Sequence, residues 1–144
     1  MKLTRTSSYA LHAVAFLAAR KDHTRPVASH HIAAARGIPD RFLLKVLKPL
    51  VSARLLFSIK GPNGGYRLAR KAEEISLLDV LEAVDGPIRG QAPFTEESNG
   101  PLNNKLEAVC NQIADQVREH FAKVLVSELV TGKGQKPDRV TGRR

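Results

Sequence analysis

The sequence predicts a mainly α-helical protein with one small β-hairpin. Apolar residues recur at helical spacing in several segments. A single glycine-rich loop separates two short runs that are typical of strands. The last apolar pattern, at residues 102–130, is the longest. Together these observations predict a winged helix-turn-helix head followed by a long C-terminal helix.

Size and composition favour one globular unit. The chain has 144 residues and a mass of 15.8 kDa, with 42% apolar and 26% charged residues. The longest apolar run, Tyr9–Ala19, is too short to span a bilayer, and no signal peptide accompanies it. The single cysteine, Cys110, excludes an intrachain disulfide framework and a four-thiolate metal site within one chain. We therefore expect a cytoplasmic protein.

The charge is divided along the chain. The formal net charge is +9 and the isoelectric point is near 10.1. Residues 1–71 hold fourteen Lys and Arg against two acids, whereas residues 72–132 hold four basic and eleven acidic residues. Such a separation favours a polyanion-binding head on a body with another role, because a charge needed only for solubility would not segregate by segment.

The first two helices are predicted at residues 6–19 and 29–36. The first carries a dense apolar pattern, and its N-cap oxygens are expected from Thr6, Ser7 and Ser8. Residues 21–26 form a polar connector. The second helix is rich in alanine and closes at Gly37, the residue type expected just past a helix end.

A third helix is expected to open at Pro39 and to complete a helix-turn-helix unit. Pro49 falls inside its pattern and should kink or tighten its last turn. Its predicted apolar face consists of Phe42, Leu43, Val46, Leu47 and Leu50.

A hairpin and two further helices follow. Residues 55–59 and 66–69 are predicted strands, joined by a loop whose residues permit positive φ, so that the hairpin forms a wing. Ser76 should cap a helix that ends before Gly86. Residues 88–101 are predicted as a loop, residues 102–130 as one long helix and residues 131–144 as a basic, flexible tail.

The outward face of the third helix is the candidate DNA-binding surface. Arg41 and Lys45 lie four residues apart, and either can donate hydrogen bonds to guanine O6 and N7. Leu44 either meets a thymine methyl or packs in the core. The other members of the predicted set are Pro39 and Lys48 on this helix, Lys60 and Asn63 in the wing, and Lys2, Arg5, Tyr9 and His30.

Several of these assignments keep an alternative. Lys60 could enter a minor groove or hold a phosphate. Lys2, Arg5, His30 and Arg36 are candidate phosphate contacts, and each could equally be an idle surface charge. No phosphate-loop, zinc-protease or serine-hydrolase motif occurs in the sequence, so we expect no catalytic residue and no enzyme activity. The five histidines are scattered apart from one adjacent pair, so we expect no metal site.

These motifs resemble those of the Rrf2 (Rrf-two) family of bacterial winged-helix transcriptional regulators, the IscR-, NsrR- and CymR-like proteins. The resemblance covers about residues 1–87, with a weaker match along the long helix. It rests on Leu3-Thr4-Arg5, Tyr9-Ala10-Leu11, Gly37-Ile38-Pro39, Phe42-Leu43, the wing sequence from Gly61 to Leu68, Ile75–Val80 and Glu82–Gly86. The resemblance implies a DNA-binding head at residues 1–87, a homodimer joined by the long helices and an inverted-repeat operator.

Many members of that family hold an iron–sulfur cluster through three cysteines in the loop before the long helix. The corresponding loop here, residues 88–101, has no cysteine. The missing cysteines therefore predict a regulator without a cofactor. The first hypothesis is that this regulator is a repressor, and the alternative is a non-specific nucleoid- or RNA-associated basic protein.

The long helix is expected to pair with a second copy because one helix of this length exceeds what a small head can cover. Its predicted dimerisation stripe consists of Leu106, Val109, Ile113, Val117, Phe121 and Val124. Cys110 lies beside that stripe, where we expect a buried, inert thiol, and a thiol redox switch is the lesser hypothesis.

Overall fold

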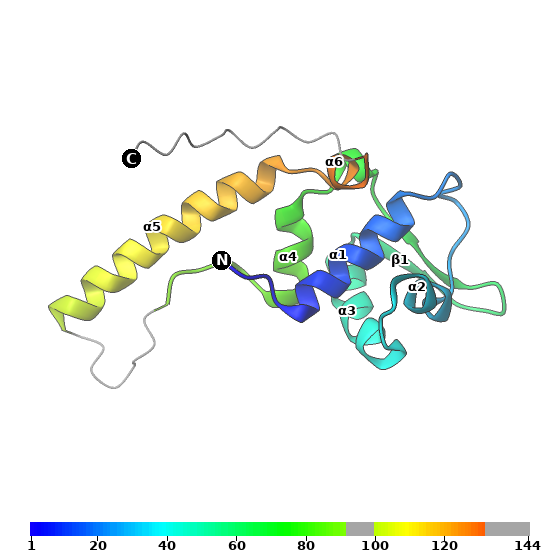
Figure 1. Cartoon of the computed structure of the whole chain (residues 1–144), viewed down its shortest axis with the longest axis horizontal. Helices are drawn as coiled ribbons and strands as arrows, with labels where there is room; N and C mark the ends of the chain where they lie inside the picture. The colour runs from blue at the N-terminus through cyan, green and yellow to red at the C-terminus, as the bar shows by residue number, and fades with distance from the viewer. Residues whose placement is uncertain (92–99, 132–144) are drawn as a thin grey trace, which may run out of the picture.

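A helical head and one projecting helix make up the computed structural model, which describes residues 1–91 and 100–131. Figure 1 shows the head on one side and the long helix extending away from it. The elements in chain order are α1 (Arg5–Ala18), α2 (Ser29–Arg36), α3 (Asp40–Ser52), β1 (Leu56–Ile59), β2 (Gly65–Leu68), the 3₁₀ turn η1 (Ala72–Glu74), α4 (Leu77–Asp85), α5 (Pro101–Lys123) and α6 (Val126–Thr131). The predicted class, mainly helical with a hairpin wing, is confirmed.

The head is organised around α1, which contacts α2, α3, α4, α6 and β2. One continuous core joins these elements. Its largest fully buried side chains include Ile32 on α2, Leu43, Leu47 and Leu50 on α3, and Ile75 before α4. Because every head element contributes to this core, the positions of α3 and of the wing are fixed relative to each other.

The N-terminus of α1 differs from the prediction. Thr4 is the N-cap, and its hydroxyl oxygen accepts from the backbone N–H of Ser7 at 3.0 Å. Ser7 is buried instead, and its hydroxyl donates to the Asp85 carboxylate at the end of α4. The hydroxyl of Thr4 donates to the same carboxylate at 2.8 Å. The expected caps Thr6, Ser7 and Ser8 were wrong: the helix begins one residue earlier, at Arg5, and the Asp85 carboxylate, which is distant in sequence, accepts from both Thr4 and Ser7.

The helix-turn-helix forms as expected. α2 spans the predicted residues, and Gly37 ends it in the left-handed conformation at φ 63°. Pro39 stands at the N-cap of α3, one residue before the first helical residue. Pro49 is accommodated inside α3, which continues to Ser52.

The wing is a two-stranded antiparallel hairpin in which Leu56 faces Leu68 and Ile59 faces Gly65. Both predicted strands are confirmed to within a residue. Gly65 must be glycine, because its φ is 151° and a Cβ there would lie 2.3 Å from the backbone of Val27. Val27 also exchanges two backbone hydrogen bonds with Tyr66, at 2.9 and 2.8 Å. This third backbone segment beside the wing was not predicted.

α4 follows the prediction closely. Ser76 accepts from the backbone N–H of Asp79, and the Asp79 carboxylate accepts from the backbone N–H of Ser76, which makes a reciprocal capping box. The helix ends at Asp85, directly before Gly86.

The single long helix predicted at residues 102–130 is wrong. α5 ends at Lys123, Val124 and Leu125 leave the helical conformation, and the chain resumes as the short α6. The carbonyl of Val124 accepts from Leu77 N–H at 2.7 Å, and Val126 N–H donates to the Ile75 carbonyl at 2.8 Å. These bonds pair the segment with the strand-like residues before α4 and place the buried Val126 in the head core.

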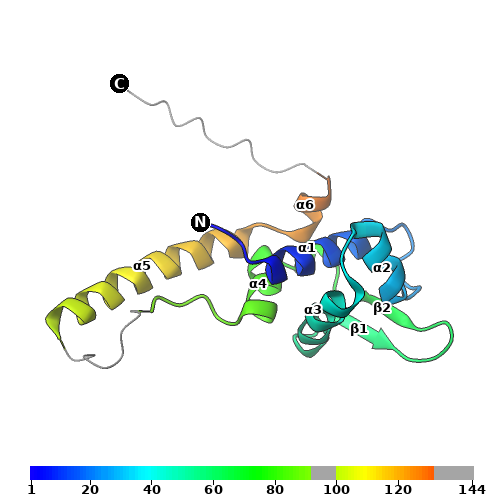
Figure 2. The same cartoon turned by 60° about the horizontal axis from the view of Figure 1, so that its bottom comes forward.

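The remaining 23-residue α5 projects from the head, as Figures 1 and 2 show from two directions. Of the predicted loop at 88–101, residues 92–99 lie outside the described residues, as does the predicted tail beyond residue 131. Gly90 lies against α5, and its backbone N–H donates to the Asn111 side-chain oxygen at 3.1 Å. None of the described helices is long and apolar enough to cross a membrane.

Candidate nucleic-acid interface

The outer face of α3 presents a row of polar and basic side chains. Arg41, Lys45 and Lys48 are exposed, whereas the opposite face of the helix is buried in the core. Leu44 is 49% exposed, which favours the surface alternative over the core alternative for this residue. Pro39 is exposed at the start of the helix. This amphipathic division is what a helix needs to pack on a domain while presenting side chains to a groove.

Phe42 does not face inward as predicted. Its side chain is 38% exposed, and its ring lies 6.5 Å from the ring of Tyr9 on α1. The guanidinium of Arg41 lies 5.0 Å from the centre of that ring, and the Lys45 ammonium lies 5.7 Å from it. We call Tyr9, Arg41, Phe42 and Lys45 the Phe42 cluster. Tyr9 on α1 offers Phe42 an aromatic partner at the rim of the core, which a pattern read along α3 alone does not reveal.

The Phe42 cluster gives the two cations a common support. Cation–π contacts at exposed sites contribute about 0.5–1 kcal/mol each, so the ring restrains both side chains without removing their hydrogen-bond donors. Neither Arg41 nor Lys45 forms an ion pair within residues 1–91 and 100–131. The donors are therefore available to an external acceptor.

The wing adds a second basic position. Lys60 and Asn63 are both exposed in its loop. Next to them, Phe57 and Ile59 are 47% and 37% exposed, and the Arg67 guanidinium lies 4.9 Å from the Phe57 ring centre. Sequence reasoning missed this Phe57–Arg67 pair. The alternation of Phe57 and Ile59 along β1 was the available signal.

The remaining predicted phosphate contacts are dispersed. Lys2 and Arg5 are exposed at the start of α1, and His30 is exposed on α2 with its ring 4.2 Å from that of His31. Arg36 lies over the ring of Phe16 at 5.8 Å and borders a hollow formed with α1 and α6. The structure joins Tyr9, Arg41 and Lys45 in one cluster and leaves these others outside it.

The helix α3 carries one acidic side chain, and a second carboxylate lies in the loop before α2. Asp40 lies in the first turn of α3, where the helix dipole favours a carboxylate. In the loop before α2, the hydroxyl and the backbone N–H of Thr24 donate to Asp22 and hold the pKa of its carboxyl below the ordinary value. Arg25 lies 3.5 Å from Asp22 and acts in the same direction.

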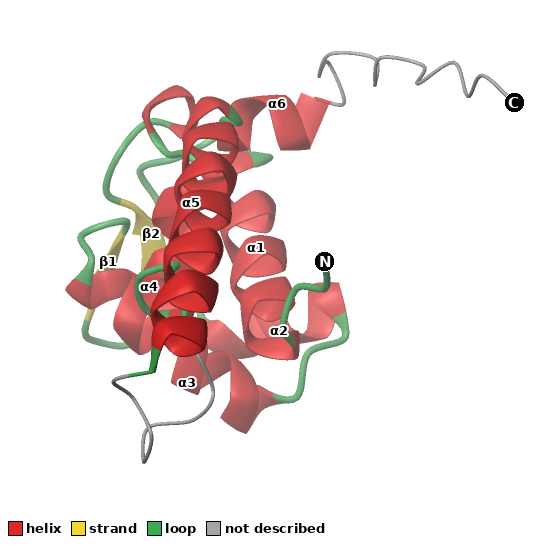
Figure 3. Ribbon diagram, turned by 90° about the vertical axis from the view of Figure 1, so that its left-hand side faces the viewer, coloured by secondary structure: helices red, strands yellow, loops and turns green. Residues whose placement is uncertain are grey.

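The stripe on the C-terminal helix is divided in two. Leu106, Val109 and Ile113 are 45%, 49% and 52% exposed, whereas Val117, Phe121 and Val124 are partly buried. The second half lies toward the head, where α5 contacts α4. Figure 3 shows α5 in front of the head. The first half is an apolar face with no partner among the described residues.

Cys110 is exposed, so the prediction of a buried thiol is wrong. The error has a physical cause: among the described residues Gly90 lies against this part of the helix, and it has no side chain that could cover the thiol. Within the described part of the chain, no group of three or more His, Cys, Asp or Glu side chains could hold a metal ion.

The protein family that matches the sequence and two of its relatives are all described as transcriptional regulators. The family model for Rrf2, described as an iron-dependent transcriptional regulator, matches residues 3–132. A Rhodobacter capsulatus protein named as an rrf2-like HTH-type transcriptional regulator is 33% identical over 131 residues, covering 89% of this chain and 84% of the relative. A Mycobacterium tuberculosis protein named as an HTH-type transcriptional regulator is 42% identical over 88 residues, and the match spans 61% of this chain and about half, 54%, of that relative.

Two solved structures of transcriptional regulators have a similar fold. CymR, the global cysteine regulator of Bacillus subtilis, superposes with a TM-score of 0.71 at 25% identity, covering 93% of this chain and 99% of CymR. IscR of T. potens superposes with a TM-score of 0.69 over 94% of this chain and 93% of its own, at 20% identity, which shows a shared fold.

Proposed function

The chain belongs to the Rrf2 family of DNA-binding transcriptional regulators, and from this premise we propose that it represses transcription as a homodimer on an inverted-repeat operator, without an iron–sulfur cluster. The observation that carries the proposal is the exposed basic face of α3, with the Phe42 cluster at its start. The DNA-binding role is assigned to residues 1–87.

DNA recognition by this surface follows from its chemistry. Arg41 and Lys45 can reach guanine O6 and N7 when α3 enters the major groove, and Leu44 offers an apolar contact for a thymine methyl. Both cations start from restrained positions over Phe42. Less side-chain entropy is then lost on binding, which favours affinity for the matching base pairs. Lys60 and Asn63 of the wing lie in an exposed loop suited to the backbone or the minor groove.

The homodimer is supported by the exposed half of the stripe. α5 is about 35 Å long, and Leu106, Val109 and Ile113 remain half exposed along it. A two-fold interface buries such a face against its own copy. Two heads joined in this way read two half-sites in opposite orientation, and a promoter covered by the dimer is closed to RNA polymerase, which is repression.

The donor set does not fit an iron–sulfur cluster. Clusters need four ligands that are mostly cysteine thiolates, and this chain has only Cys110. A dimer supplies two copies of it. The description of the family as iron-dependent therefore does not extend to a cysteine-held cluster in this chain, and no step of the proposed function passes through iron.

Genome-wide footprinting of the purified protein tests the proposal. We expect protection of one inverted repeat at a small set of promoters. Its half-sites should lie about one helical turn of DNA, or a multiple of it, apart. The Arg41→Ala/Lys45→Ala double variant should lose these footprints and keep weak binding to all DNA. Uniform coating of DNA by the wild-type chain would contradict the proposal and support the nucleoid-type alternative.

Cys110 supports one subordinate hypothesis, a thiol switch, because the residue is exposed. If oxidation controls DNA binding, an oxidant should release wild-type protein from its operator and leave the Cys110→Ser variant bound. Unchanged operator binding by oxidised wild-type protein would exclude it.

A further inference from the structure

A hollow of about 740 Å³ opens on the head where the wing strand, the end of α1 and α6 meet. Its volume falls within the range of about 300–1,000 Å³ that small-molecule sites occupy. We propose that this hollow binds a small zwitterion of the free amino acid class, as an effector of DNA binding. The effector role rests on the proposed function, whereas the binding itself does not.

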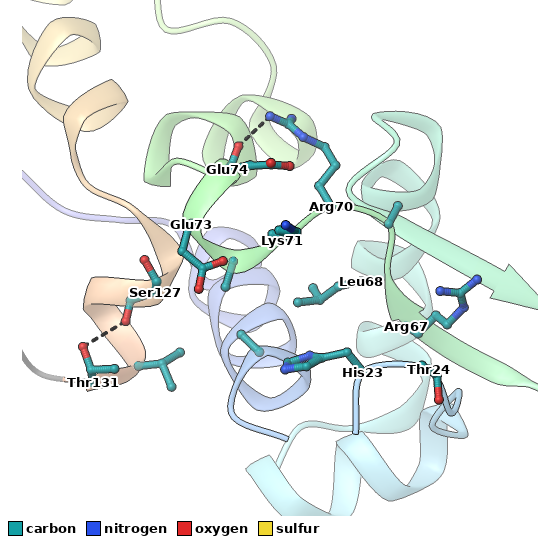
Figure 4. A pocket seen from close by; sticks show the side chains of 14 residues that line it. His23, Thr24, Arg67, Leu68, Arg70, Lys71, Glu73, Glu74, Ser127 and Thr131 are labelled. Carbon is teal, nitrogen blue, oxygen red and sulfur yellow. Dashed lines mark hydrogen bonds between the residues drawn. The ribbon is translucent and has the colours of Figure 1, made fainter. Parts of the chain in front are cut away.

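Charged side chains of both signs surround the hollow (Figure 4). His23 comes from the loop after α1, whereas Lys71 and Glu73 come from the segment between β2 and α4. All three are exposed, and none of them forms an ion pair or a side-chain hydrogen bond within the described residues. The hollow thus offers an ammonium, an imidazole and a carboxylate that have no side-chain partners among residues 1–91 and 100–131.

The two arginines that border the hollow are already engaged. The Arg67 guanidinium lies over the Phe57 ring, and Figure 4 shows its side chain pointing away from the centre. Arg70 donates to the Glu74 carbonyl at 2.5 Å and lies 3.9 Å from the Asp79 carboxylate. Lys71 is therefore the cation most available to a ligand, and Glu73 is a carboxylate with no side-chain partner in the part of the chain that the structure describes.

This bipolar lining selects the class of ligand. A simple anion attracted by Lys71 would be repelled by Glu73. A simple cation attracted by Glu73 would be repelled by Lys71. A molecule that carries both an ammonium and a carboxylate group satisfies both side chains. The rest of the lining includes Ala18, Leu68, Ala72 and Val130, which gives an apolar side chain of the ligand a surface to cover.

The position of the hollow connects it to DNA binding. One wall, at Leu68, belongs to the wing strand, and the opposite wall, at Ser127 and Val130, belongs to α6. α6 follows α5 after only Val124 and Leu125, and that link is hydrogen bonded to the residues before α4. A ligand that holds both walls biases the angle between α5 and the head, and in the dimer that angle sets the separation of the two α3 helices.

The test is an amide NMR titration of the full-length protein, without DNA, with each of the twenty L-α-amino acids at 10 mM. We expect at least one of them to shift the resonances of Ala18, Ala72 and Val130 in a saturable manner. The N-acetyl derivative and the amide of that amino acid, which lack the ammonium and the carboxylate charge respectively, should bind at least tenfold more weakly. Glu73→Gln should also weaken binding at least tenfold, whereas Glu119→Gln on the exposed side of α5 should not.

Two outcomes overturn the proposal: no saturable shift at the hollow with any of the twenty amino acids, or equal binding of the N-acetyl and amide derivatives. Operator footprinting without ligand is run on the same preparations. Intact footprints without any shift would refute the effector site alone. Shifts without any footprint would refute the proposed function and leave the binding site in place.

Discussion

The head and α5 use their apolar residues in opposite ways. The head buries a continuous core in which Ile32, Leu43 and Leu50 are completely inaccessible. In α5, Ala114 is the one buried residue among those described, and three larger apolar side chains remain about half exposed. Hydrophobic burial stabilises a fold roughly in proportion to the apolar area removed from water. The head is therefore stabilised by its own contacts, and α5 needs a further surface.

The joint between the two regions is narrow. α5 contacts α4, Arg118 of α5 pairs with Glu82 of α4, and Gly90 lies against the α5 backbone near Cys110. The ordered continuation into α6 returns the chain to the head core at Val126. α5 is thus held to the rest of the chain along its C-terminal half, from about Cys110 onward, and its N-terminal half is free to reach a partner.

The largest expected effect is on assembly. Ile113→Asp places a carboxylate in the centre of the proposed dimer seam, twice in each dimer because of the two-fold symmetry. We expect the dimer dissociation constant to rise by about a thousandfold or more, which corresponds to about 4 kcal/mol for uncompensated buried charge. Sedimentation velocity at protein concentrations from about 1 to about 100 µM measures the change in the dissociation constant.

The matched control is Gln112→Asp, which adds the same charge at the adjacent exposed position, outside the stripe. It should remain dimeric. If the wild-type protein sediments as a monomer at micromolar concentration, the proposed dimer is wrong. The exposed apolar face of α5 is then not a dimer interface.

The next prediction compares the stability contributed by the head core with that contributed by the exposed face of α5. Leu47→Ala removes a completely buried side chain from the head and should lower the free energy of unfolding by about 2–5 kcal/mol. Leu106→Ala on the 45% exposed face should lower it by less than about 1 kcal/mol per protomer, and only at concentrations where the dimer forms. Urea unfolding at two protein concentrations distinguishes them. Equal, concentration-independent losses would mean that Leu106 packs within its own chain.

A smaller effect concerns DNA. Arg41→Ala or Lys45→Ala should each weaken operator binding by about 1–3 kcal/mol and affect random DNA much less. Lys105→Ala, on the exposed surface of α5, is the matched control and should change neither. Fluorescence anisotropy on operator and scrambled duplexes at fixed salt gives both affinities. Equal losses on both duplexes would mean that these side chains contact phosphates and that the bases are read elsewhere.

Local signals made the head predictable. Gly37 marks the end of α2, the glycine-rich loop marks the wing, and Ser76 with Asp79 marks the start of α4. Each of these features depends on residues within a few positions of one another, so that the sequence pattern and the structure contain the same information.

Most of the failures involve contacts between distant segments. The hydroxyl of the Thr4 cap also donates to Asp85, which lies 81 positions away. The pairing of Val27 with Tyr66 and the break in the helix at Val124 depend on backbone contacts between distant segments. Phe42 turned outward because Tyr9 on another helix offers it an aromatic neighbour. Helical periodicity alone contains none of these contacts.

The smallest expected effect is at the joint between the head and α5. Arg118 donates to the Glu82 carboxylate, and the side chains of the pair are 39% and 21% exposed. Solvent screens such a partly exposed pair, so a double-mutant cycle with Glu82→Gln and Arg118→Met should give a coupling of about 0.2–1 kcal/mol. The Glu82 carboxylate also accepts from the backbone N–H of Ile88 at 2.8 Å, so Glu82→Gln alone should cost more than Arg118→Met alone. Urea unfolding is measured at low salt and again in about 0.5 M NaCl, which screens charges. The coupling energy between Glu82 and Arg118 should be smaller at the higher salt concentration. A coupling near zero at low salt would mean that apolar packing holds α5 to the head. A coupling that does not change with salt would mean that the dimer shields the Arg118–Glu82 pair from solvent.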